Sequence, residues 1–461
     1  MALGGGTFVA QNKKLPGAYI NFVSLARATA ALSGRGVCTM PLELDWGVED
    51  EVFTVTNENF QKDSMRIFGY AADHEKMRGL WDLFLNARVL HAYRLNGGGA
   101  KAENDFAVAL YGGTRGNDLK IVIQANVDDE ALFDVYTYMG TSLVDSQTVS
   151  TAAELTANDF VRFKPEAVLA VTASSPLAGG TNKEADGEAH QKYLDKIESY
   201  SFNVMGVTAE SETVKKLYVS FNKRLRDEMG VKFQLVGHEI AGDYMGVVNV
   251  KNNTLDEGWP GTSLVYWVTG AECGCEVNRS VQNKKYDGSF RVNTDFTQAQ
   301  LEQCIDRGEF VLHRVNSDIR VLEDINSMVT LSEECGAVFK DNQTVRVIDQ
   351  LGNDDAVLFN TKYLGVVPNK ASGRTSLWSD LKKLREDLQT MGAIENFTDS
   401  DLTVEQGDTK KSVVVTGCTG TTYLRNAGKG GTGGGKCGKG PILGGFAAGR
   451  PRNRGGMSQL F

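Results

Sequence analysis

The chain has 461 residues and a formal net charge of −9, and hydrophobic residues make up 41% of it. At roughly 100–200 residues per domain, this length predicts two to four domains. No stretch approaches about 18 consecutive apolar residues, and the N-terminus has no basic segment followed by an apolar one, so we expect no membrane insertion, no secretory signal, and folding in a cytoplasm.

Residues 1–22 show no helical periodicity, and Pro16 and Gly17 indicate a turn, so they are predicted to form an extended N-terminal arm. Residues 23–98 have a mixed pattern and are expected to begin an α/β domain. The predicted strands are 36–42 and 87–95, and the predicted helices are 57–68 and 74–86.

Residues 99–180 change character and favour an inserted β-sandwich domain. Short β-rich segments recur here, separated by turn residues at the spacing typical of a small sandwich or barrel. These segments are 105–111, 119–123, 133–138 and 141–149.

Residues 181–345 return to alternating helices and strands, which predicts a parallel sheet covered by helices. The expected helices are 190–200, 211–228 and 262–270, and the expected strands are 202–207, 232–236 and 246–250. Residues 346–416 are expected to form a C-terminal domain with a helix at 376–391 and a strand–turn–strand unit at 394–415.

The last segment, residues 417–461, is compositionally different from the rest of the chain. It contains 15 glycines and seven Lys or Arg residues but no Asp or Glu, so the rest of the chain carries a charge of −16. Such a segment cannot bury enough apolar surface to order itself, which predicts a flexible basic tail. The acidic body argues against a nucleic-acid-binding protein.

The sequence offers no recognisable catalytic, metal or cofactor site. The seven cysteines are scattered and odd in number, which argues against a disulfide framework, and no CxxC or HxxxH spacing indicates a metal. Phosphate-binding glycine loops and a GxSxG nucleophile motif are both absent. None of the histidines has a sequence neighbour that suggests a catalytic triad (His74, His91, His190, His238 and His313). We therefore expect no cofactor and no enzymatic activity.

Several long stretches resemble the phage tail sheath proteins of contractile myophages and PBSX-like defective prophages. They follow one another in order, and the resemblance extends from residue 1 to about 416. The stretches are residues 1–8, 15–23, 41–47, 115–119, 264–271, 321–326 and 404–415.

The resemblance implies a multidomain α/β protein with an inner subtilisin-like domain, an inserted β-sandwich and extended terminal arms. It implies subunits that form rings of six around a tail tube and contract, with the tube, baseplate and tail terminator proteins as further partners. The expected location is the tail of a phage or phage-like particle assembled in the bacterial host cytoplasm.

Arms of this family add strands to the sheets of neighbouring subunits, and strand addition uses backbone hydrogen bonds at an exposed sheet edge. The candidate arm residues for subunit interaction are Tyr19, Ile20, Asn21, Phe22, Val23, Ser412, Val413, Val414, Val415 and Thr416. The alternative is that both segments pair within their own chain.

One departure concerns the C-terminus, because the family ordinarily continues beyond this point with another apolar β segment. Here Gly417-Cys418-Thr419-Gly420 and the basic tail take its place. If the last strand is missing, we expect weak lateral assembly. Other hypotheses are a tail-tube or other particle protein, a serine hydrolase on a subtilisin-like fold, which would need a Ser–His–Asp set in a cleft, and a nucleic-acid binder that uses the basic tail.

Overall fold

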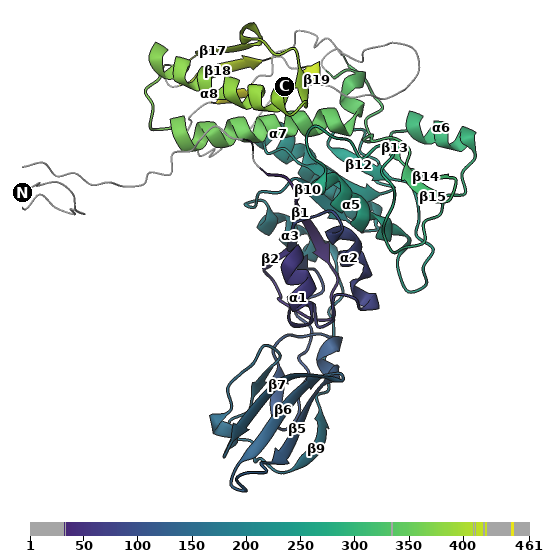
Figure 1. The fold of residues 1–461 in the computed structure, drawn as a ribbon, viewed down its shortest axis with the longest axis vertical. Helices are drawn as coiled ribbons and strands as arrows, with labels where there is room; N and C mark the ends of the chain where they lie inside the picture. The colour runs from purple at the N-terminus through teal and green to yellow at the C-terminus, as the bar shows by residue number, and fades with distance from the viewer. Residues whose placement is uncertain are drawn as a thin grey trace, which may run out of the picture.

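The chain folds into three bodies stacked along its long axis, as the computed structural model in Figure 1 shows. The structure describes Leu32, residues 34–332, 335–408, Lys410 and residues 412–417, together with two short strands farther along the chain. A central domain lies between an inserted β domain at one end and a C-terminal domain at the other.

The central domain is built on a seven-stranded sheet in the order β13-β12-β11-β10-β1-β3-β2. All neighbouring strands are parallel except β2 and β3. β10, β11 and β12 are buried along their whole length, as expected of parallel strands covered on both faces. The strands are β1 (Val37–Leu42), β2 (Val52–Thr56), β3 (Val89–Arg94), β10 (Val204–Val207), β11 (Gln234–His238), β12 (Val247–Val250) and β13 (Glu309–Phe310).

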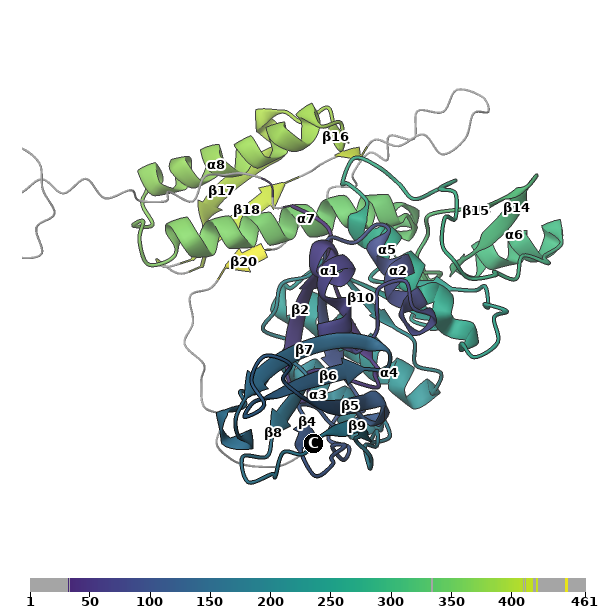
Figure 2. The same ribbon diagram turned by 60° about the horizontal axis from the view of Figure 1, so that its bottom comes forward.

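Helices cover both faces of this sheet. The helices α1 (Asn57–Phe68), α2 (Arg78–Phe84) and α5 (Leu264–Gly274) share one hydrophobic core with it. On the other face lie α3 (Gly187–Ile197) and α4 (Glu212–Lys223), which continues into a π-helical turn, η4 (Arg224–Met229). α6 (Gln298–Asp306) and the hairpin of β14 (Leu312–Val315) and β15 (Asp318–Val321) project to one side (Figures 1 and 2).

The inserted β domain leaves the central sheet after β3. A four-stranded antiparallel sheet, β7-β6-β5-β9, shares one core with the pair β4-β8. Side chains alternate between buried and partly exposed along β5, as expected of a strand with one face on the core. The strands are β4 (Ala107–Ala109), β5 (Leu119–Ala125), β6 (Phe133–Met139), β7 (Ser142–Val149), β8 (Val161–Phe163) and β9 (Thr172–Pro176).

The C-terminal domain consists of two long helices and small antiparallel sheets. α7 (Asn342–Leu358) lies between the central sheet and the rest of this domain (Figure 2). A π-helical turn, η7 (Phe359–Tyr363), leads to α8 (Ala371–Thr390), which packs on β17. The strands are β16 (Ile394–Glu395), β17 (Leu402–Gln406), β18 (Val413–Gly417), β19 (Gly420–Thr421) and β20 (Gly444–Phe446).

The α/β class with an added β domain is confirmed, and so are most of the predicted helices and strands. The helix predicted at 376–391 is α8, whose Leu377, Leu381, Leu384 and Leu388 are all buried. The edge strand β2 and the helix α7 were not predicted. α7 has no clean apolar stripe, because many of the side chains that it buries are polar or charged.

Candidate functional site

The C-terminal candidate arm residues form a strand inside their own chain. In β18, Val413 pairs with Gln406 of β17 on one side and with Phe446 of β20 on the other. Ser412 directly precedes this strand, and its carbonyl accepts hydrogen bonds from Gly407 N (2.9 Å) and Asn369 Nδ2 (2.8 Å). The N-terminal candidates, Tyr19 to Val23, lie outside the described residues.

β17 is an edge strand of this sheet. Within the described part of the chain, no strand pairs with its outer edge. A groove of about 400 Å³ runs between β17 and the first half of α8. Its lining comes from both elements: Ala371, Arg374, Thr375, Trp378, Leu402, Thr403 and Val404. An edge strand beside a groove is the geometry that strand addition requires.

The start of the described chain also lies at the C-terminal domain. Leu32 packs against the hydrophobic core of that domain, which is formed by side chains of α7, α8, β17 and β18. Leu32, the first described residue, therefore lies beside the same core as β18 and β17.

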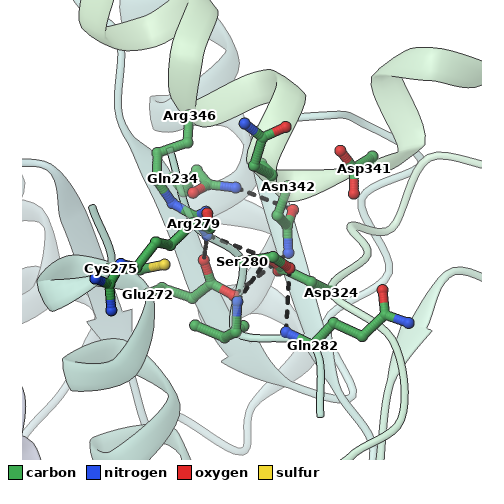
Figure 3. Close-up of polar contacts among 12 residues, drawn as sticks. Gln234, Glu272, Cys275, Arg279, Ser280, Gln282, Asp324, Asp341, Asn342 and Arg346 are labelled. Atoms are coloured by element: carbon green, nitrogen blue, oxygen red, sulfur yellow. Dashed lines mark hydrogen bonds and ion pairs between the residues drawn. The ribbon is translucent and has the colours of Figure 1, made fainter. Parts of the chain in front are cut away.

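α7 joins the C-terminal domain to the central domain through a cluster of buried charged groups (Figure 3). Glu272 of α5 and Arg346 of α7 are fully buried, and Asp324 is 1% exposed. Arg346 Nη2 donates to Glu272 Oε2 at 2.5 Å and to Asp324 Oδ2 at 3.4 Å, and its Nη1 donates to the carbonyl of Arg279 at 2.8 Å.

Polar neighbours hold this cluster in place. Asp324 Oδ2 also accepts from Ser280 Oγ at 2.7 Å and from the backbone N–H of Val281 at 3.1 Å. Gln234 of β11 donates to Asn342 Oδ1 at 3.0 Å, which ties the sheet to the first turn of α7. Such buried polar networks fix the orientation of the elements that they join when their members are satisfied.

The pKa values of the two carboxyl groups in the cluster are shifted in opposite directions. Burial and the nearby Asp324 raise the pKa of Glu272 to about 8, against the opposing effect of Arg346. Burial alone would raise the pKa of Asp324, but the charge of Arg346 and hydrogen bonds lower it below its usual value. Like charges at one buried site push two pKa values apart in this way.

A second buried ion pair fixes the middle of α7. Arg226, in the π-helical turn η4, is 1% exposed and Asp349 of α7 is 4% exposed. The contact is bidentate, with Nη1–Oδ2 at 2.5 Å and Nη2–Oδ1 at 2.7 Å, and Nη1 also donates to the carbonyl of Phe233. Burial would lower the pKa of Arg226, but the Asp349 carboxylate raises it above the usual value.

A third pair joins α7 to α8. Arg385 of α8 donates to both carboxylate oxygens of Asp355, at 3.1 and 2.8 Å. α7 therefore carries Arg346, Asp349 and Asp355, which bind groups of α5, η4 and α8 respectively. Sequence reasoning missed all of these residues, because the partners are far apart along the chain and belong to no known short motif.

The base of the inserted β domain has a buried joint of its own. Arg94, at the end of β3, is 1% exposed and donates to the carbonyls of Gly47 (3.2 Å) and Gly112 (2.8 Å) and to Asn182 Oδ1 (3.3 Å). Asn182 Nδ2 in turn donates to Asp45 Oδ1 at 2.8 Å. One side chain thus connects the end of β3 to the β domain, at Gly112, and to the segment that leaves this domain, at Asn182.

Two of the histidines lie at hydrogen-bonding distance from a hydroxyl group. His190 Nδ1 lies 2.7 Å from the hydroxyl of Tyr218, and His91 Nδ1 lies 2.9 Å from Thr54 Oγ1. Among the described residues, no group of three or more His, Cys, Asp or Glu side chains is placed to hold a metal ion. No helix in the described ranges is both long and apolar enough to span a bilayer.

Comparisons with known proteins agree with this architecture. Residues 96–182 match the phage tail sheath protein beta-sandwich domain, residues 183–327 match the phage tail sheath protein central domain, and residues 335–418 match the phage tail sheath C-terminal domain. The phage-like element PBSX protein XkdK of Bacillus subtilis is 32% identical over 452 residues, which are 90% of this chain and 96% of XkdK.

Solved structures of similar fold include two sheath proteins. The sheath tail protein from Desulfitobacterium hafniense superposes with a TM-score of 0.77 at 34% identity, over 87% of this chain and 96% of that chain. The anti-feeding prophage helical sheath in its contracted state has the same fold, with a TM-score of 0.53 at 12% identity over 90% of this chain and 98% of that chain. The chain belongs to the phage tail sheath protein family.

Proposed function

We propose that this chain assembles into stacked rings of six subunits around a tail tube, and that contraction of the sheath drives the tube through a target cell envelope. Its partners are then further copies of itself, the tube protein, and the baseplate and tail terminator proteins. The proposal includes assembly in the cytoplasm of a bacterial host, and no direct contact with nucleic acid or insertion into a membrane.

Strand addition links the subunits in this proposal. One observation carries it: no described strand pairs with the outer edge of β17, which borders the groove on α8, and Leu32 packs on the core of this same domain. An arm that enters the groove extends the β17–β18 sheet through backbone hydrogen bonds. The arm residues would be Tyr19 to Val23 of one subunit, with Ser412 to Thr416 in the sheet that receives an arm or in an exchanged strand.

The domain division gives each part a mechanical role. We assign residues 1–22 to the N-terminal arm, 23–98 and 181–345 to the inner α/β domain, 99–180 to the β-sandwich, 346–416 to the C-terminal domain and 417–461 to the tail. Contraction then repacks rigid bodies against each other while the arms keep the subunits linked. The ion pairs of α7 and the joint at Arg94 support this proposal, because they fix the three bodies of one subunit together.

We further propose that the chain catalyses no reaction. A serine-directed covalent probe is expected to leave the purified protein unlabelled, and stoichiometric labelling of one serine would overturn this part of the proposal.

Sedimentation of assembled particles tests the proposed function. The full chain is compared with a form that lacks residues 1–23. We expect the full chain to pellet as large assemblies, and we expect removal of the N-terminal arm to leave soluble monomers with an unchanged melting temperature. If the form without the arm pellets as readily as the full chain, strand addition by this arm is wrong.

A further inference from the structure

At the joint between α5 and α7, more buried acidic groups than basic groups are in direct contact. Two carboxyl groups, those of Glu272 and Asp324, lie against the single guanidinium of Arg346, and all three side chains are at most 1% exposed. The two carboxyl groups are also within hydrogen-bonding reach of each other. Asp324 Oδ1 finds no hydrogen-bond donor among the described residues.

The other charged or titratable groups around the cluster do not neutralise it by contact. Arg35, on the segment before β1, donates to the backbone carbonyls of Cys275 (2.8 Å) and Glu272 (3.2 Å) and not to a carboxylate. Asp349, farther along α7, is already paired with Arg226. Asp341, at the start of α7, caps that helix by accepting from Thr344. The thiol groups of Cys273 and Cys275 also lie near the cluster, and burial raises the pKa of the Cys275 thiol.

Electrostatics favours one proton in this cluster. Two ionised carboxylates in contact with one guanidinium leave an excess negative charge at this buried contact. Such a charge is costly, because burial removes the solvation that water would give it. A proton held between the two carboxyl groups removes that charge and supplies the missing donor. Paired carboxyl groups in proteins hold a shared proton for the same reason.

We propose that Glu272 and Asp324 share a single proton in the folded protein, and that loss of this proton in alkaline solution loosens the attachment of α7 to the central domain. The C-terminal domain then opens away from the central sheet more often at high pH, while the inserted β domain stays folded.

The sign of the pH dependence follows from the Glu272 carboxyl group. Its pKa is about 8 in the folded protein and close to 4.5 when exposed, so the folded state binds the extra proton. The stabilisation is complete at acidic pH and declines as the pH rises through about 8. Between about pH 4.5 and pH 8, each pH unit increases the opening of the joint by about tenfold, and the opening levels off above pH 8.

Hydrogen exchange of the full chain at pH 7 and pH 9 tests the proposal. The measured quantity is the protection of the α7 amides relative to the amides of β6, because this ratio cancels the common effect of pH on exchange chemistry. In the wild type the ratio is expected to fall by about tenfold between the two pH values. In Glu272→Gln, which keeps a neutral side chain of similar size, the ratio is expected to stay constant.

Glu51→Gln is the matched control, because Glu51 is exposed and its substitution removes the same charge at a site far from the cluster in sequence. It should retain the wild-type fall. The proposal is overturned if the ratio in the wild type does not change, or if Glu272→Gln shows the same fall as the wild type.

A second measurement needs no variant and covers the case in which Glu272→Gln fails to fold. Infrared spectroscopy of the wild type with isotope-labelled glutamate carboxyl groups should show a protonated carboxyl band at pH 7 that disappears by pH 9.5. A spectrum without any protonated glutamate at pH 7 would contradict the shared proton.

Discussion

Removal of Asp349 should destabilise the attachment of α7 more than any exposed substitution. Asp349→Ala leaves the guanidinium of Arg226 buried at 1% exposure. Its Nη1 then keeps the hydrogen bond to the carbonyl of Phe233 but has no carboxylate partner. Breaking a buried ion pair in this way costs about 3–5 kcal/mol, because one charge stays desolvated without compensation. The expected loss is therefore far larger than the charge change alone would suggest.

The double variant Arg226→Met with Asp349→Leu separates this reason from simple loss of packing. It removes both charges and keeps much of the volume, so its stability should be within about 1 kcal/mol of the wild type or higher. Asp306→Ala, at an exposed position on α6, is the control and should change stability by less than about 0.5 kcal/mol.

Urea titration followed by a short proteolysis pulse measures the unfolding of the C-terminal domain in the full chain. The prediction requires a large loss in Asp349→Ala and recovery in the double variant. A loss below about 1 kcal/mol in Asp349→Ala, or a double variant less stable than the single one, would show that Arg226 finds other compensation.

Two further substitutions test the other contacts between elements. Arg94→Ala leaves the buried carbonyls of Gly47 and Gly112 without their donor, which costs about 1–3 kcal/mol for each group. Limited proteolysis should then cut the links to the inserted β domain faster. An unchanged cleavage rate would count against this joint. Gly270→Ala would place a Cβ 2.3 Å from the carbonyl oxygen of Leu83, so α2 and α5 must separate and the melting temperature should fall. Gly187→Ala, which meets nothing within 4 Å, is its control and should leave the melting temperature unchanged or slightly raised.

Much of the fold could be predicted because local pattern and final burial agree. The leucines spaced at three and four residues predicted α8, and all of them are buried in the structure. The alternation at residues 119–123 predicted β5, whose Leu119, Ile121 and Ile123 face the core. In these elements, hydrophobic burial alone decides both the secondary structure and the side that faces inward.

The rest could not be predicted because it depends on partners distant in sequence. α7 buries Arg346 and Asp349, which a periodicity search reads as exposed, and their partners Glu272 and Arg226 lie 74 and 123 residues away. The position of β1 between β3 and β10 likewise follows from packing of the whole domain. The candidate arm residues at 412–416 were predicted as a strand, and the strand is present, but only an assembly can test their role between subunits.

Electron microscopy of the purified full chain in negative stain shows directly whether this protein assembles as a sheath. We expect hollow cylinders of regular diameter whose end views have sixfold rotational symmetry. A chain that stays monomeric at every concentration, even when its folded state and its intact arms have been verified, would contradict a sheath subunit that assembles by itself.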